Sequence, residues 1–97
     1  MEVAVNDLAK EKLKERGLED KYMKVYYEAG GWSGGLQMDF EDEMREEVGQ
    51  EYKLYEVDGY KIRINKDLLD EYDYMEIKYA NNFIQQGFYP SKLRPEE

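Results

Sequence analysis

Hydrophobic and polar positions alternate along most of this 97-residue chain, and the period of the alternation marks its elements. The first stretch, VAVNDLAKEKLKERG, begins with apolar residues 3–5 and continues with Asn6, a favoured helix N-cap, and Asp7, whose charge suits a helix N-terminus. The apolar side of the expected helix comprises Leu8, Ala9 and Leu13. Gly17 can adopt the left-handed conformation that ends a helix. The pattern therefore predicts a short strand and then a helix that ends by Gly17.

Two strand patterns flank a glycine-rich loop. Residues 22–28 (YMKVYYE) alternate in the period of a half-buried strand and place Tyr26 and Tyr27 on opposite faces. Residues 36–41 (LQMDFE) alternate in the same way. Between them stands GGWSGG, with the only tryptophan of the chain, Trp32, between two pairs of glycines and beside Ser33. We therefore expect two strands joined by a tight loop that presents residue 32.

The second half of the chain begins with an acidic segment, residues 41–51, which has no clear period and indicates a solvated connection. Asp58-Gly59 then joins two alternating runs, as a type I′ hairpin requires. NKDLLDEY predicts a short helix capped near Asn65 or Lys66, with Leu68, Leu69 and Tyr72 facing inward. YMEIKYA predicts a strand with Met75, Ile77 and Tyr79 on one side and Glu76 and Lys78 on the other. NNFIQQGFYP fits either an irregular hairpin arm or a final turn.

This order predicts an α+β fold: a mixed, mostly antiparallel β-sheet covered on one side by two short helices. The length suits one core, so we expect a single domain over residues 1–90 and a polar C-terminal tail over residues 91–97.

The net charge and the residue types that the sequence lacks exclude several classes of function. The net charge of −9 repels nucleic-acid backbones and anionic lipid surfaces, so we expect neither nucleic-acid nor membrane binding. The first twenty residues are charged where a signal peptide needs an apolar segment, which favours a cytoplasmic protein. The chain has no cysteine and no histidine, which excludes disulfides, thiolate chemistry and imidazole ligands.

The motifs taken in order resemble the HesB-like domain of A-type iron–sulfur cluster carriers, the IscA-like family. The family's loop reads Gly-Gly-Cys-Ser-Gly before an apolar strand that often contains Gln. The residues that stand at matching places are Val5, Asp7, Leu8, Ala9, Gly30, Gly31, Ser33, Gly34, Gln37, Asp58, Gly59, Tyr60, Lys61, Ile62, Leu69, Ile77, Tyr79, Gly87 and Phe88. The resemblance covers Val3 to about Phe88 and implies a HesB-like fold, a role in iron–sulfur cluster biogenesis, homodimers and protein partners in cluster assembly.

The departures from the family concern its ligands. The family's cluster-ligating loop cysteine falls on Trp32, and the two cysteines expected near the C-terminus are absent. Clusters are held by thiolates and occasionally by imidazole, whereas an indole N–H only donates. We expect no cofactor for the chain as written. The tryptophan codon is one base from the cysteine and selenocysteine codons, so an iron or iron–sulfur cluster is expected only if residue 32 is natively Cys or selenocysteine.

Other interpretations of these residues stay open. Trp32 can pack against the sheet or a second subunit, or can anchor a partner protein. Gly30, Gly31, Gly34 and Gly35 could cradle an anion, and the six carboxylates between Asp39 and Glu47 could hold a hard cation, although neither segment matches a known motif. The chain lacks an evident nucleophile and base pair, so we expect no enzyme.

The sequence therefore predicts a HesB/IscA-like protein-binding or regulatory module that does not ligate a cluster itself. Its site residues are Trp32 and the presenting loop formed by Gly30, Gly31, Ser33 and Gly34. The alternative is a small-molecule or hard-metal binder that uses the glycine loop or the acidic loop.

Overall fold

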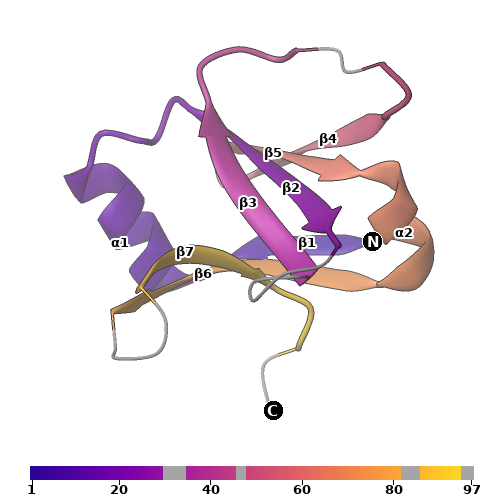
Figure 1. Cartoon of the computed structure of the whole chain (residues 1–97). Helices are drawn as coiled ribbons and strands as arrows, with labels where there is room; N and C mark the ends of the chain where they lie inside the picture. Colours follow the sequence, from indigo (N-terminus) through magenta and orange to yellow (C-terminus); the bar gives the residue numbers. More distant parts are fainter. Residues whose placement is uncertain (30–34, 46–47, 82–85, 95–97) are drawn as a thin grey trace.

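The computed structural model describes residues 1–29, 35–45, 48–81 and 86–94 (Figure 1). Within them the chain forms, in order, β1 (Glu2–Val5), α1 (Asp7–Glu15), β2 (Tyr22–Glu28), β3 (Gly35–Glu41), β4 (Tyr52–Val57), β5 (Tyr60–Asn65), α2 (Lys66–Glu71), β6 (Tyr74–Asn81) and β7 (Gln86–Ser91). The predicted α+β class, with two short helices and mostly antiparallel strands, is confirmed.

The strands form two sheets where the sequence pattern predicted one. A four-stranded sheet has the order β3-β2-β5-β4, and a three-stranded sheet has the order β1-β6-β7. The pairs β1/β6 and β2/β5 are parallel, and the other three pairs are antiparallel. The sheets meet where β3 contacts β7, with the Phe40 and Phe88 rings edge to face at 5.3 Å, and where β1 contacts β4. The core therefore lies between two small sheets.

Alternating residues of the strands fill this core, as the period of two requires. Met23 and Val25 of β2 are paired in register with Ile62 and Ile64 of β5, and all four side chains are fully buried. Met75 and Ile77 of β6 face them from the other sheet. Two helices close the remaining sides with Ala9, Leu13 and Leu68. Burial of each large aliphatic side chain stabilises the fold by about 1.5–3 kcal/mol.

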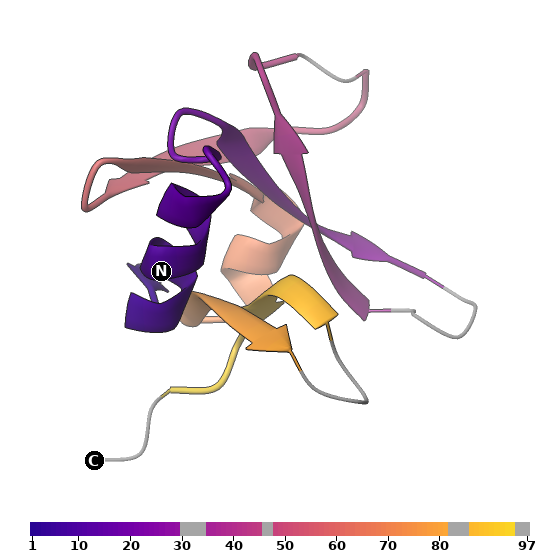
Figure 2. The same cartoon turned by 90° about the vertical axis from the view of Figure 1, so that its left-hand side faces the viewer.

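The two helices begin as predicted and lie at opposite ends of the molecule, not on one side of a sheet (Figures 1 and 2). Asn6 caps α1 by accepting a hydrogen bond from the Leu8 amide at 3.0 Å, and Asn65 caps α2 in the same way from the Asp67 amide. Gly17 follows α1 with φ +66°, as a left-handed residue. Leu8, expected on the apolar side of α1, is 45% exposed, because the buried face is formed by Ala9 and Leu13 alone.

The β4–β5 hairpin confirms the Asp58-Gly59 prediction. Both turn residues have positive φ, +53° for Asp58 and +87° for Gly59, which is the conformation of a type I′ turn. Lys10 of α1 forms an ion pair with Asp58 at 2.6 Å. The turn is thereby tied to the helix that covers the adjacent end of the core.

The C-terminal segment is a hairpin arm, the first of the two predicted alternatives. Strand β7 pairs antiparallel with β6, from Asn81 opposite Gln86 to Glu76 opposite Ser91, so the strand extends one residue into the predicted tail. On the side of β6 opposite Met75 and Ile77, where it was expected, Glu76 is only 6% exposed. Its carboxylate accepts hydrogen bonds from the Tyr74 hydroxyl and the Asn6 amide group, which compensate for its burial.

Candidate functional site

The candidate site named by the sequence is the connection between β2 and β3. These strands pair along their full length, from Tyr22 opposite Glu41 to Glu28 opposite Gly35, and their last pair forms the base of the connection. The predicted site residues Gly30, Gly31, Trp32, Ser33 and Gly34 lie outside the described residues. What the structure describes is the base of this loop and the surface beside it.

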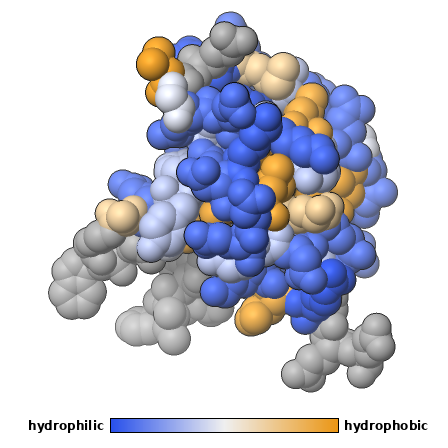
Figure 3. Space-filling model, turned by 90° about the vertical axis from the view of Figure 1, so that its right-hand side faces the viewer, coloured by the Kyte–Doolittle hydropathy of each residue, from blue (hydrophilic) through white to orange (hydrophobic). Residues whose placement is uncertain are grey.

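A hollow of about 380 Å³ lies at the base of the loop. It is lined by Tyr27, Gly35, Leu36, Tyr72, Tyr89, Pro90, Ser91, Lys92 and Leu93. Tyr27 is 58% exposed and Leu93 is 68% exposed, although both side chains are largely apolar. Figure 3 views the side of the molecule that carries α2, where hydrophobic side chains appear as separate patches within a mostly hydrophilic surface. Exposed apolar side chains that line a common hollow, as Tyr27 and Leu93 do, are typical of interaction surfaces.

The outer face of the four-stranded sheet carries a row of tyrosines and cations. The ammonium group of Lys61 lies 4.3 Å from the centre of the Tyr22 ring, and that of Lys24 lies 5.3 Å from the Tyr26 ring. The Arg63 guanidinium lies 4.8 Å from the Tyr52 ring. Cation–π contacts of this kind contribute about 0.5–1 kcal/mol each at exposed positions. The tyrosines of this face therefore stabilise the packing of the sheet.

Among these tyrosines, Tyr26 also forms a hydrogen bond between strands, because its hydroxyl donates to Asp39 of β3 at 2.8 Å. Partial burial, followed by this hydrogen bond and the negative charge of Asp39, raises the pKa of Tyr26 from 10.0 to about 12. The folded state thus holds the phenol proton more tightly than the unfolded state.

We expect the stability conferred by Tyr26 to be fully present below pH 10 and to be lost as the pH rises through about 12. The Tyr26→Phe variant should therefore show a weaker loss of thermal stability over this pH range than the wild type. Unfolding midpoints measured by circular dichroism at a series of alkaline pH values test this. Equal slopes for the two proteins would show that the Tyr26 phenol does not carry the effect.

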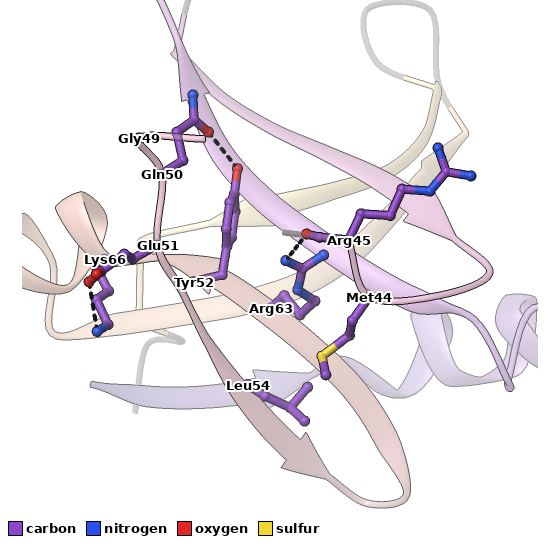
Figure 4. Close-up of a pocket in the computed structure, with 9 residues that line it drawn as sticks. All are labelled: Met44, Arg45, Gly49, Gln50, Glu51, Tyr52, Leu54, Arg63 and Lys66. Carbon is purple, nitrogen blue, oxygen red and sulfur yellow. Dashed lines mark hydrogen bonds and ion pairs between the residues drawn. The ribbon is translucent and has the colours of Figure 1, made fainter. Parts of the chain in front are cut away.

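A second hollow, of about 720 Å³, lies between the acidic connection and the sheet (Figure 4). Arg63 of β5 lies in it with its side chain only 7% exposed. One guanidinium nitrogen donates to Glu41 at 2.9 Å, and another donates to the backbone carbonyl of Arg45 at 2.9 Å. Figure 4 shows the side chain of Arg45 pointing away from Arg63 while its carbonyl faces it. Arg63 therefore fastens the connection to the sheet.

The charges of this second hollow are matched by neighbours. Glu51 pairs with Lys66 at 2.9 Å, and the hydrogen bond from Lys66, followed by its positive charge, lowers the pKa of the Glu51 carboxyl. Arg63 pairs with Glu41 in the same hollow. We interpret these ion pairs as interactions that hold the acidic connection against the sheet, and we do not assign a ligand to this hollow. The sequence analysis missed Arg63, and the available signal was a basic residue at the polar position of an otherwise buried strand.

The acidic segment does not assemble its carboxylates around one point. Asp39 accepts from Tyr26, Glu41 from Arg63, and Asp42 from Lys21, which lowers the pKa of the Asp42 carboxyl. Among the described residues, no group of three or more acidic side chains is arranged to hold a metal ion. Glu46 and Glu47 lie outside those residues. The described carboxylates thus give no support to the alternative of a hard-metal binder in the acidic loop.

The donor set also does not fit an iron–sulfur cluster. Soft sulfide-bridged iron requires thiolates or imidazoles, and the sequence contains no cysteine and no histidine. Besides Ser91 and Lys92, the residues at the described base of the loop are phenols, a glycine, a proline and leucines, and none of them is a soft ligand. No chemical step through a cluster follows from this chain as written.

Comparison with known proteins gives no assignment. No family model matches the chain, and no curated protein matches it. In the part of the chain that the structure describes, no helix has the length and hydrophobicity needed to cross a membrane.

Proposed function

We propose that this chain is a HesB/IscA-like protein related to iron–sulfur cluster biogenesis that binds other proteins through the β2–β3 loop and the surface at its base. In this proposal it ligates no cluster, catalyses no reaction and acts in the cytoplasm. The homodimer implied by the resemblance stays a prediction within it.

One observation carries the proposal: side chains from three separate parts of the chain lie at the base of the β2–β3 hairpin. Tyr27 comes from β2, Tyr72 follows α2, and Leu93 follows β7. Tyr27 and Leu93 are exposed, and Tyr72 is half-buried. Large exposed side chains at the base of a hairpin whose loop sequence contains a tryptophan have the composition of a protein-binding hot spot, where Trp and Tyr are enriched. Because the sequence has no cysteine or histidine, the same loop is not needed to ligate an iron–sulfur cluster, which is its use in the family.

Trp32 supplies the experiment, because it is the only tryptophan of the chain. Protein labelled with 5-fluorotryptophan gives one ¹⁹F resonance, which reports on residue 32 alone. We expect titration with an iron–sulfur cluster scaffold protein to shift or broaden this resonance at micromolar concentration. The Trp32→Phe variant, labelled with 4-fluorophenylalanine and titrated in parallel, should bind at least about tenfold more weakly, as loss of a hot-spot residue predicts.

The control is the same titration with lysozyme, a basic protein of unrelated fold, which should leave the resonance unchanged. A resonance that responds to neither the scaffold protein nor the other proteins of cluster assembly would contradict the proposed function.

A further inference from the structure

Two hollows at the base of the β2–β3 hairpin share two of their lining residues. The first is the 380 Å³ hollow described above, and the second, of about 620 Å³, lies against α2. Tyr27 and Tyr72 line both. A segment lying across these two rings would therefore contact both hollows, and we call this surface the tyrosine groove.

The end of the tyrosine groove at α2 is aromatic and acidic. Asp67 and Glu71 stand one helical turn apart on α2, and both line this end together with Tyr26, Tyr27 and Tyr72. Both carboxylates are exposed, and neither forms an ion pair with another residue of the described chain. The end thus offers two uncompensated negative charges beside aromatic rings, the combination that attracts an ammonium or guanidinium group.

The other end of the groove is mostly apolar. Leu36, Tyr89, Pro90 and Leu93 line it together with Ser91 and Lys92. The ammonium nitrogen of Lys92 lies 5.1 Å from the centre of the Tyr72 ring. An aromatic ring of the groove thus already contacts one cation of the chain itself.

We propose that the tyrosine groove binds a segment of a partner protein that carries alternating basic and aliphatic side chains. Its basic side chains lie at Asp67 and Glu71, and its aliphatic side chains lie at Leu36 and Leu93. This inference rests on the proposed function, since it names the chemistry of the partner. Charge complementarity favours a basic segment over a second copy of this chain as the molecule bound in the groove. Each copy carries a net charge of −9, so two copies repel each other, whereas a basic segment is attracted.

The test uses a fluorescein-labelled peptide of alternating lysine and leucine residues as the probe, with binding to the full chain followed by fluorescence anisotropy. We expect saturable binding that weakens as salt is raised, because exposed charge pairs are screened. The double variant Asp67→Asn/Glu71→Gln should bind about tenfold more weakly, from the loss of two exposed charge pairs. A peptide with glutamine in place of lysine should show a comparable loss with the wild-type protein.

A matched control separates the groove from the net charge. The double variant Glu19→Gln/Asp20→Asn removes the same number of negative charges from two exposed residues after α1, at the end of the molecule opposite α2 (Figure 1). It should bind the lysine peptide as the wild type does. All substituted side chains are exposed, and thermal unfolding checks that each variant is folded.

Equal weakening by both double variants would show that binding depends on net charge and would overturn the inference. So would the absence of binding, or a homodimer that Tyr27→Ser dissociates and that excludes the peptide. The two proposals fail separately: a response of the Trp32 resonance without peptide binding contradicts the groove alone. Peptide binding without a response at Trp32 supports the groove and contradicts the proposed function.

Discussion

Replacing Arg63 by methionine is expected to lower the free energy of unfolding by about 3 kcal/mol, as removal of one partner from a buried ion pair does. Methionine preserves much of the aliphatic volume but leaves two acceptors without their donor, the Glu41 carboxylate and the Arg45 carbonyl. The Glu41 side chain is only 19% exposed, so water compensates it poorly. Urea unfolding followed by circular dichroism measures the effect.

Lys61→Met is the matched control for this prediction. Lys61 lies on the same strand and the same face as Arg63, and it contacts the Tyr22 ring at 4.3 Å. No ion pair of Lys61 is found among the described residues, so its replacement should cost less than about 1 kcal/mol. In a double-mutant cycle with Glu41→Gln, the Arg63 and Glu41 substitutions should be strongly non-additive. Additive effects, or equal costs for Arg63→Met and Lys61→Met, would show that Arg63 does not fasten the acidic connection.

The local elements were predictable because short-range chemistry determines them. Asn6 and Asn65 cap the two helices with their side-chain oxygens, and both are adjacent to the first helical residue in sequence. The Asp58-Gly59 turn needs two residues with positive φ, which few residue types supply. The period of two places Met23, Val25, Ile62 and Ile64 on one face because a strand alternates its side chains.

The arrangement of these elements was not predictable in the same way. Alternation identifies a strand but not its partner, so the division into two sheets could not be derived from the pattern. The burial of Glu76 was not predictable, because its partner Asn6 becomes a neighbour only when β1 and β6 pair. Its other partner, Tyr74, lies two residues earlier on β6 itself. Arg63 was overlooked because its partners, Glu41 and the Arg45 carbonyl, come from a connection with no regular pattern.

The candidate site was likewise predictable in its local part and not in the part that depends on the fold. The glycines around Trp32 drew attention to the β2–β3 loop from the sequence alone. The surface at its base could not be predicted, because Tyr72, Tyr89 and Leu93 are distant from the loop in sequence and converge on it only in the fold. Asp67 and Glu71 belong to the predicted short helix, and the groove beside them became visible only with the structure.

In the proposed function, position 32 decides whether the chain can ligate iron as the family does. An indole cannot replace a thiolate as a ligand, because its nitrogen lone pair belongs to the ring. A thiolate at this position would restore one of the two soft donor types, thiolate and imidazole, that the sequence lacks. The wild type and the Trp32→Cys variant should therefore differ completely in their response to iron and sulfide.

The central claim, our proposal that this HesB/IscA-like chain does not ligate a cluster, is tested most directly by anaerobic reconstitution. Both proteins are incubated with ferrous iron, sulfide and dithiothreitol, desalted, and examined by visible absorption and iron analysis. We expect no sulfur-to-iron charge-transfer band and no retained iron for the wild type, and a visible band for Trp32→Cys. A variant that stays colourless would contradict the assignment of residue 32 to the family's ligand position. A charge-transfer band in the wild-type protein would contradict the central claim.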